Sequence, residues 1–337
     1  MQQELRFATF NVCNLAPPGA KLYDNLAPLT ADEYQAKIDW TAHQLDQLDA
    51  DVIGLQEVFS MAAMREVLAR SRRYREATLS GFDPAPDPET GAPRWMPQVA
   101  LVSRLPLAAP AVAYSMFPGG VALPAGSRDA DRFARAPVHA QVLLADGRIV
   151  DVLVVHLKSK RPDYRNGQCG DNGEGMDFPM QYAQANLRSL IRRGTEAVAL
   201  RALLSEMART LRRPQVVLGD FNDTADAVTT TIVMGAGANC VPGQELSGRL
   251  FDCNQIQLRQ DHLRHVGYTN IHEGHYMTID HVLVSEEFNP LSRYAIGEVL
   301  DVTYLNDHLL QQKPEASDHG QVLVRLRLYG ARDPATT

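Results

Sequence analysis

The segment Gly219-Asp220-Phe221-Asn222 is the part of the sequence best suited to chemistry. It follows the apolar run Val216–Leu218, which predicts a strand, and strand alternation points Asp220 and Asn222 to the same side. A carboxylate and a carboxamide on one side suit a base or metal ligand combined with a contact to a phosphate oxygen.

Two later segments add an aspartate and a histidine. Asp280 lies inside the apolar run Ile279–Val284, where a buried carboxylate needs a partner. Ser317-Asp318-His319 immediately precedes the last apolar run. Because an aspartate can orient and charge a histidine, we predict that Asp280 pairs with His319 for acid–base catalysis. Asn306-Asp307-His308 has a similar composition, but no comparable strand follows it, so we reject it as a catalytic segment.

Polar residues also end apolar runs in the first half of the chain. They are Asn11 and Asn14 after Phe7–Phe10, Glu57 after Asp51–Leu55, and His156 after Val152–Val155. Taken singly, each has a plain interpretation, as a turn asparagine, an exposed or capping glutamate, or a hydrogen-bonded structural histidine. Their chemical meaning depends on whether the fold brings them together.

A basic corner follows His156. The chain has only five lysines, and two of them, Lys158 and Lys160, lie in the segment His156–Arg161. A compact ammonium group is a natural partner for phosphate oxygen, so we predict an anion-binding corner here. An ordinary solvated turn is the alternative that the sequence leaves open.

These residues must be positioned by alternating strands and amphipathic helices. Thr30 and Glu33 form a capping box before a helix that runs from about residue 31 to 48, and Ser60 predicts the cap of a helix through about Arg70. A long helix is predicted over Gln181–Leu211. The predicted strands are Phe7–Val12, Asp51–Leu55, Val99–Val102, Val138–Leu144, Ile149–Val155, Gln215–Leu218, Ile279–Val284 and Gln321–Leu328.

Hairpins and helical crossovers alternate in this pattern, which favours an α/β (α+β) fold with sheets covered by helices. The chain shows no internal repeat or linker, so we predict one domain over residues 1–330 and a frayed tail over 331–337. The apolar residues of the long helix include Leu187, Leu190, Ile191 and Val198.

Composition excludes several classes of protein. The 337 residues are 45% hydrophobic and 22% charged, and no run approaches the roughly 18 apolar residues of a membrane span. The four cysteines are too few for a disulfide scaffold and contain no CxxC pair. Cys240 and Cys253 could close one loop, but we expect free thiols in a cytoplasmic protein, because the N-terminus does not resemble a signal peptide. The net charge of −7 argues against nucleic-acid binding by bulk charge and leaves room for a local basic site.

Six motifs in this order resemble the endonuclease/exonuclease/phosphatase superfamily, whose fold is that of deoxyribonuclease I. They are Phe10-Asn11-Val12-Cys13-Asn14, Leu55-Gln56-Glu57, His156-Leu157, Gly219-Asp220-Phe221-Asn222, Ile279-Asp280-His281 and Ser317-Asp318-His319. The match spans residues 5–328. The resemblance implies a four-layered αββα sandwich, with two mixed sheets packed face to face and helices outside. The sequence after His156 is most similar to bacterial members.

The resemblance also implies roles for these residues. Glu57 would hold a divalent metal, magnesium or alternatively manganese, with Asn11 and Asp318 nearby. Asp220 would position or deprotonate the attacking water, and Asn222 and His156 would hold phosphate oxygens together with Asn11, Lys158 and Lys160. His319, oriented by Asp280, would stabilise the transition state or move a proton. Cys13 departs from the pattern, because several relatives carry a polar or acidic residue there. Val58 and Phe59 replace a nearby arginine with which pancreatic deoxyribonuclease grips DNA.

Two function classes remain after this comparison. We favour a nuclease or phosphodiesterase that acts on nucleic acid by direct attack of water, and the alternative is a phosphatase or phosphodiesterase on a small-molecule or lipid head-group ester. A binding module without activity is disfavoured, because Glu57, Asp220 and His319 are intact. No protein partner is inferable.

Two other groups of residues are given less weight. A second metal site at Asp261-His262-x-x-His265 and His272-x-x-His275 is disfavoured. We expect the arginine groups at 70–75 and 188–193 to be solvated, with Arg193 pairing with Glu196 on the helix.

Overall fold

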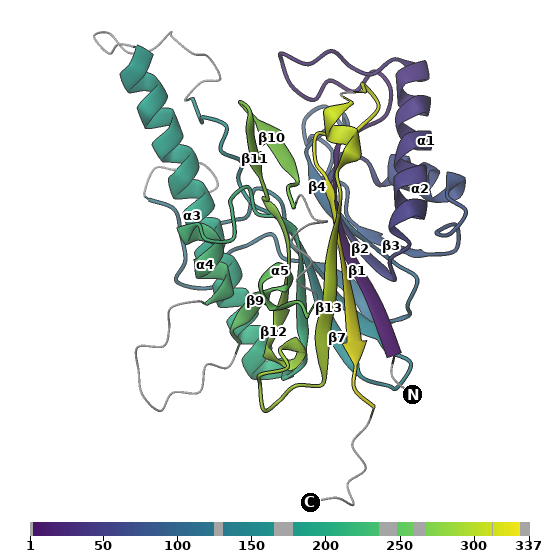
Figure 1. The fold of residues 1–337 in the computed structure, drawn as a ribbon. Coiled ribbons are helices and arrows are strands. Elements are labelled where there is room, and N and C mark those ends of the chain that lie inside the picture. Colours follow the sequence, from purple (N-terminus) through teal and green to yellow (C-terminus); the bar gives the residue numbers. More distant parts are fainter. Residues whose placement is uncertain are drawn as a thin grey trace, which may run out of the picture.

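The computed structural model describes residues 3–124, 131–164, 178–235, 248–258, 267–311 and 313–330. Two six-stranded sheets form its centre (Figure 1). The first has the order β13-β14-β1-β2-β4-β3. Its strands are β1 (Gln3–Leu15), β2 (Val52–Val58), β3 (Thr78–Gly81), β4 (Gln98–Ser103), β13 (Gly297–Leu305) and β14 (Gln321–Leu328). β1 pairs in parallel with β2 and antiparallel with β14, so the sheet is mixed.

The second sheet has the order β5-β6-β7-β8-β12-β9. Its strands are β5 (Leu107–Ala113), β6 (Val138–Leu143), β7 (Ile149–His156), β8 (Gln215–Asp220), β9 (Leu250–Asp252) and β12 (Asp280–Ser285). β7 and β8 are parallel and the other pairs are antiparallel. A separate hairpin consists of β10 (Asn270–His272) and β11 (His275–Met277).

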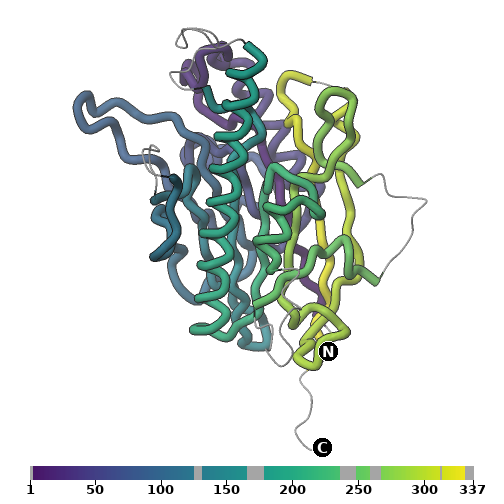
Figure 2. The backbone as a smooth tube through the Cα atoms, turned by 90° about the vertical axis from the view of Figure 1, so that its left-hand side faces the viewer, coloured from purple at the N-terminus to yellow at the C-terminus, as the bar shows by residue number. Residues whose placement is uncertain are grey.

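Helices cover the outer face of each sheet. On the first sheet they are α1 (Ala31–Leu48) and α2 (Met61–Arg70), and on the second α3 (Phe178–Leu211) and α4 (Val228–Met234). Figure 2 shows α3 running along the length of its sheet. The short elements α5 (Cys253–Ile256), η1 (Glu286–Phe288) and η2 (Asp307–Leu310) connect strands. The predicted four-layered αββα sandwich is therefore confirmed.

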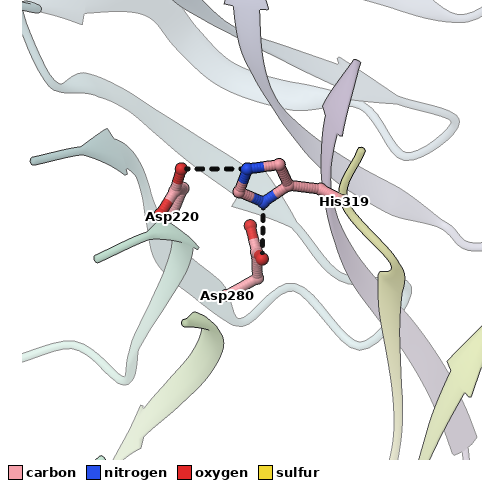
Figure 3. Close-up of side chains that lie close together, drawn as sticks. All are labelled: Asp220, Asp280 and His319. Carbon is pink, nitrogen blue, oxygen red and sulfur yellow. Dashed lines mark hydrogen bonds and ion pairs between the residues drawn. The ribbon is translucent and has the colours of Figure 1, made fainter. Parts of the chain in front are cut away.

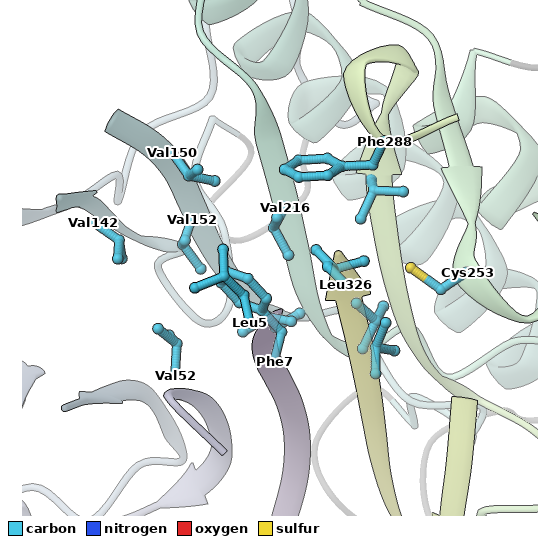
Figure 4. Packing of buried hydrophobic residues seen from close by; sticks show 14 of the residues in the cluster. Leu5, Phe7, Val52, Val142, Val150, Val152, Val216, Cys253, Phe288 and Leu326 are labelled. Carbon is cyan, nitrogen blue, oxygen red and sulfur yellow. The ribbon is translucent and has the colours of Figure 1, made fainter. Parts of the chain in front are cut away.

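Three apolar clusters hold these layers together. The largest lies between the sheets, where Phe7 and Val52 of the first sheet meet Val152 and Val216 of the second (Figure 4). The other two lie between each sheet and its helices. At Gly54 the sheets approach closely, because an added Cβ would lie 2.7 Å from the Cβ of Leu218. The packing therefore fixes the distance between β2 and β8, the strands that lead into Glu57 and Asp220.

The helix caps form as the sequence predicts. Thr30 accepts a hydrogen bond from the N–H of Glu33, whose carboxylate accepts one from the N–H of Thr30. Ser60 caps α2 by accepting from the N–H of Ala63. Strands β3, β5, β9 and β13 and the β10–β11 hairpin were not predicted from the sequence. These are short or irregular segments, except for β13, whose pattern contains the charged residues Glu298 and Asp301.

Several apolar residues of α3 do not lie on the face of the helix that packs against the sheet. Leu203, Leu204 and Met207 face the sheet, but the apolar residues Leu187, Leu190, Ile191 and Val198 are exposed. In this half of the helix the buried positions are instead Ala185, Ser189, Arg193, Glu196 and Ala197, so polar and charged side chains take up much of the inner face. The prediction that Arg193 is solvated was therefore wrong, because its side chain is 6% exposed and pairs with Asp223 at 3.1 Å.

Two further observations concern the whole chain. Within the described ranges, no helix is long and apolar enough to cross a membrane. Cys13 and Cys253 carry free thiols, whereas Cys169, Cys240 and the 331–337 tail lie outside the described residues.

Candidate active site

Strand register brings three predicted site residues side by side at one end of the second sheet. β7 places His156 opposite Asp220 of β8, and β12 places Asp280 opposite the same Asp220. Cross-strand partners point to the same face of a sheet, and all three residues are buried. Gly219 allows this close pairing, because an added Cβ would collide with the carbonyl oxygen of Val155 on β7.

Asp280, His319 and Asp220 form a row that links the two sheets (Figure 3). Nδ1 of His319 lies 2.9 Å from Oδ2 of Asp280, and its Nε2 lies 3.9 Å from Oδ2 of Asp220. Burial opposes the charged imidazolium, but Asp280 and Asp220 outweigh it and raise the pKa of His319 well above its ordinary value. The pairing of Asp280 with His319 that the sequence predicts is thus present, and it keeps His319 protonated at neutral pH.

Asp220 is the centre of the site. Burial and the negative charge of Asp280 raise the pKa of Asp220 to about 7, although His319 acts in the opposite direction. Its Oδ1 accepts the N–H of Asn222 at 2.8 Å, and its Oδ2 lies 3.1 Å from Nδ2 of Asn11 and 3.4 Å from Nε2 of His156. A carboxylate with a pKa near neutrality can accept a proton at neutral pH.

His156 and Asn222 flank this carboxylate. Burial, followed by the charges of Arg135 and His319, lowers the pKa of His156, so the ring is neutral at neutral pH. Its Nδ1 is buried without a hydrogen-bond partner. Asn222 has a positive φ of 53° and donates its side-chain N–H to the carbonyl of Leu157 at 2.9 Å. Both residues therefore face the same corner beside Asp220.

Backbone irregularity positions the residues of the first sheet. The pairing of β1 with β2 shifts register between Asn11 and Leu15. Within this shift, Cys13 and Asn14 both have positive φ, 51° and 55°. Glu57 also has a positive φ, 58°. Residues other than glycine rarely adopt this conformation, and such strain concentrates at functional sites.

The bulged segments converge on the carboxylate of Glu57. The N–H of Asn14 donates to Oε2 of Glu57 at 3.1 Å, and Nδ2 of Asn11 lies 3.4 Å from Oε1. The same Nδ2 reaches Asp220, while Oδ1 of Asn11 accepts the N–H of Cys13 at 3.0 Å. As placed, Asn11 therefore joins carboxylates of the two sheets through its N–H groups, whereas the expected metal contact would need its oxygen.

The side-chain oxygens of Glu57, Asp318 and Asn14 are of the kind that binds a hard divalent cation. Glu57 is half-buried and Asp318 is exposed, so both are open to solvent. Oδ1 of Asn14, next to Glu57, is buried and has no hydrogen-bond partner. Oxygen ligands of this kind, with room for water, suit magnesium or manganese. Although Asp318 is exposed as a residue, nearby atoms partly desolvate its carboxyl group, which raises the pKa. The charge of His319, a hydrogen bond from Cys13 and the charge of Lys37 outweigh this effect, so the pKa of Asp318 is lowered and the carboxylate is charged.

Asp220, Asp280 and His319 are a second group whose ligand atoms lie within 4.8 Å of one another. This group suits a metal less well. A histidine must be neutral to bind a metal, and the aspartates raise the pKa of His319. The metal position at Glu57 and Asp318 stays a prediction.

A buried lysine lies beneath that position. Lys37 on α1 is 4% exposed, and its ammonium group lies 3.5 Å from the carbonyl of Glu315. Burial lowers the pKa of Lys37, while the negative charges of Asp318 and Glu57 act to raise it. Lys37 is not among the site residues predicted from the sequence. Its position on the same helix face as Tyr34 and Ile38 was the available signal, because a charge within an apolar stripe needs partners.

Lys158 and Lys160 have partners within the protein. Nζ of Lys158 donates to the carbonyls of Ser159 and Arg161 at 3.1 and 3.0 Å, and Nζ of Lys160 lies 2.9 Å from Oδ1 of Asp223. Burial, first of all, lowers the pKa of Lys158 to about 8. The structure places both lysines next to the site, but with their ammonium groups engaged.

The long helix α3 supports the loops of the site, which the sequence analysis did not predict. Arg193 pairs with Asp223 and donates to the carbonyl of Lys158 at 3.3 Å. Glu196 is 1% exposed and accepts the N–H of Lys158 at 2.8 Å and that of Ala134 at 3.0 Å. The expected ion pair of Glu196 forms with Arg192 rather than Arg193. Polar residues inside an otherwise apolar helix were the signal for this role.

The histidines that the sequence analysis disfavoured have other positions in the structure, and one of them supports the site. Nε2 of His308 lies 2.8 Å from the carbonyl oxygen of His319, so its ring supports the backbone of the site. His272 and His275 are exposed on the β10–β11 hairpin. Residues 261–265 lie outside the described ranges.

One family model matches most of the chain, and solved structures of proteins from that family share its fold. The sequence model of the endonuclease/exonuclease/phosphatase family matches residues 8–319. An endonuclease/exonuclease/phosphatase from Bacteroides vulgatus is 19% identical, with a TM-score of 0.58 over 97% of this chain and 100% of that one. The human Nocturnin catalytic domain with bound sulfate is 16% identical, with a TM-score of 0.58 over 97% and 95%. A mannosyl-6-phosphatase from Bacteroides thetaiotaomicron is 15% identical, with a TM-score of 0.52 over 96% and 99%. No functionally curated protein sequence matches the chain.

Proposed function

We propose that this chain, which belongs to the endonuclease/exonuclease/phosphatase family and is therefore a divalent-metal-dependent phosphoester hydrolase, acts on phosphodiesters. Water attacks the phosphorus directly in the proposed reaction, and nucleic acid is the first candidate substrate. The observation that carries this proposal is the row of Asp280, His319 and Asp220, which the side chain of Asn11 joins to Glu57 of the first sheet. It combines a proton acceptor, a protonated histidine and a metal-binding carboxylate at one point.

In the proposed reaction Asp220 accepts a proton from water as the water oxygen forms a bond to phosphorus. The bond from phosphorus to the leaving oxygen breaks, and His319, held charged by Asp280, donates a proton to that oxygen or stabilises its charge. Asn222 and His156 bind non-bridging oxygens in the corner beside Asp220. Glu57 and Asp318 would hold magnesium, which supplies positive charge to the phosphate when bound.

Hydrolysis of chromogenic esters tests this proposal. We would measure cleavage of bis(p-nitrophenyl) phosphate and p-nitrophenyl phosphate with magnesium or manganese, comparing the wild type with Asp220→Ala. Asp307→Ala is the matched control, because Asp307 belongs to the similar but rejected segment and is exposed. We expect diester cleavage that Asp220→Ala abolishes and Asp307→Ala leaves intact. Full activity in Asp220→Ala would contradict the mechanism, and plasmid DNA and RNA would be tested next.

A second candidate is hydrolysis of a small phosphomonoester. The partners of Lys158 and Lys160 favour it, because ammonium groups bound to carbonyls and to Asp223 are less available to the backbone of a polymer. Preference for p-nitrophenyl phosphate would support this candidate. A DNA or RNA activity whose salt dependence flattens in the double variant Lys158→Ala/Lys160→Ala would support the first.

A further inference from the structure

The N-terminal half of α3 carries an apolar stripe on its outer side. The stripe consists of Met180, Leu187, Leu190, Ile191 and Val198, each of which is between 38% and 55% exposed. Their spacing of three, four and seven residues places them along one side of the helix, which we call the outer stripe. Figure 2 shows α3 at the surface of the molecule along its whole length. A contiguous apolar stripe at a surface marks a site of interaction.

The charged residues of the same half of α3 lie off the outer stripe. Between residues 180 and 198 they are Arg188, Arg192, Arg193 and Glu196. Arg193 and Glu196 are buried, and Nε of Arg192 lies 3.1 Å from the carboxylate of Glu196. Nε of Arg188 donates to the carbonyl oxygen of Asp163 at 2.8 Å. At 3.6 residues per turn none of the four falls on the outer stripe, which therefore carries no charge of either sign.

A groove of about 430 Å³ adjoins the outer stripe, between α3, α4 and the segment 120–122. Its lining contains no charged residue and includes Ile191, Thr195 and Val198 from α3, Ile232 from α4 and Val121 from the opposite segment. The groove shares Ile191 and Val198 with the outer stripe, so the two form one continuous apolar surface. An apolar side chain from outside can therefore be buried in the groove.

The area and charge of this surface fit a second copy of the chain. The stripe exposes roughly 500 Å² of apolar surface, and with the walls of the groove it approaches the ~800 Å² that each partner buries in a standard interface. A two-fold axis brings the same surface of both copies together, so an uncharged stripe creates no like-charge pairs. Homodimer interfaces are also more apolar than transient ones, with few charged residues at their centre.

An axis near Ile191 allows each copy to fill the groove of the other. Leu187 and Thr195 both lie four residues from Ile191, so an antiparallel pair of α3 helices about this axis places Leu187 of one copy opposite Thr195 of the other. Leu187 is the most exposed residue of the outer stripe and does not line the groove of its own chain. Its side chain is therefore the one available to the partner's groove.

We propose that the protein forms a two-fold homodimer through the outer stripe of α3, with Leu187 of each copy in the groove of the other. A membrane surface fits this stripe less well. Helices that lie on membranes present lysine and arginine to anionic lipids, whereas Arg188 and Arg192 are bound within the protein and the chain has a net charge of −7. The dimer covers the half of α3 whose inner side holds the loop of Lys158, and it does not depend on the reaction proposed above.

Sedimentation velocity from low to high micromolar concentration tests the dimer. We expect the wild type to reach twice the mass of the chain, and Leu187→Glu to raise the dissociation constant at least about 100-fold, because its carboxylate would enter an apolar groove. Leu187 is exposed in the single chain, so this variant should keep the circular dichroism of the wild type. Leu291→Glu is the matched control, since Leu291 is 93% exposed between η1 and β13, and it should dimerise as the wild type does. A wild type that stays monomeric, or a Leu187→Glu variant that dimerises normally, would overturn the proposal.

Cross-linking tests the antiparallel arrangement. With a mild oxidant, Ile191→Cys should form a disulfide-linked dimer, because its two thiols meet near the axis. Met180→Cys lies on the same stripe, but its two thiols would be about 30 Å apart and should give no more cross-linking than the wild type. Equal cross-linking of both variants would refute the arrangement.

Vesicles of phosphatidylcholine, with and without phosphatidylserine, test the lipid alternative. We expect the wild type to remain in solution in a flotation assay with either composition. Binding to these vesicles that Leu187→Glu abolishes and Leu291→Glu retains would assign the outer stripe to a lipid surface and overturn the dimer.

Discussion

The two sheets contribute to the site in opposite ways. The second sheet supplies His156, Asp220 and Asp280 from regular strand pairing, and these side chains are buried, with His156 3.4 Å from Asp220. The first sheet supplies Glu57 from an irregular strand end with positive φ, and this residue remains open to solvent beside exposed Asp318. Regular buried geometry suits groups that must keep one pKa and one orientation, whereas an open acidic edge suits a metal ion that exchanges with solvent.

Asp220→Asn is expected to show the largest effect, because it removes the proton acceptor of the buried half. We expect kcat/KM to fall about 1,000-fold to 10,000-fold with little change in metal affinity. Steady-state kinetics and a manganese titration would measure the two quantities, with Asp307→Asn as control. Loss of metal binding in Asp220→Asn would place the metal among Asp220, Asp280 and His319 and would remove the division between the two sheets.

Glu57→Gln tests the open half. The substitution keeps the shape of the side chain and removes the charge that would hold the cation, so we expect manganese to bind about 10-fold to 100-fold more weakly. Activity should then return in part at high metal concentration, unlike the activity of Asp220→Asn. Electron paramagnetic resonance of free manganese would give the affinity. An unchanged affinity would show that Glu57 is not a ligand.

The pH profile sharpens the description of the buried half. Asp220 accepts a proton only when it is ionised, and its pKa is raised to about 7, so kcat/KM should rise with pH up to about that value and then level off. His319 remains protonated across this range, because Asp280 and Asp220 raise its pKa. Asp280→Asn removes a charge that raises the pKa of Asp220, so with His319 kept charged by Asp220 the residual activity should have its midpoint at lower pH. A midpoint that stays in place would mean that Asp280 does not act on Asp220.

The same difference between the sheets explains what could be predicted from the sequence. The pairing of Asp280 with His319 could be predicted, because a carboxylate inside an apolar run needs a partner and the histidine immediately precedes another strand. The position of Asp220 beside them comes from the pairing of β8 with β12, which the structure shows. The orientation of Asn11 could not be predicted, since it depends on a bulge and on two consecutive residues with positive φ. Arg193 was missed for another reason. Its contact with Asp223 joins segments that are distant in sequence, and no local pattern records such a contact.

Gly54→Ala is expected to have the smallest effect, and it tests whether the distance between the sheets matters for joining the two halves. An added methyl group would press β2 against Leu218 and Val154, so we expect a loss of about 1–3 kcal/mol of stability. Gly194→Ala on α3 is the control, because nothing lies within 4 Å of its added Cβ and alanine favours a helix by about 1 kcal/mol. Chemical denaturation would measure both. Because Glu57 lies three residues beyond Gly54 and Asp220 lies two beyond Leu218, a widened gap should also lower kcat/KM in Gly54→Ala. An enzyme that loses stability but keeps full kcat/KM would show that the two halves tolerate a change in their separation.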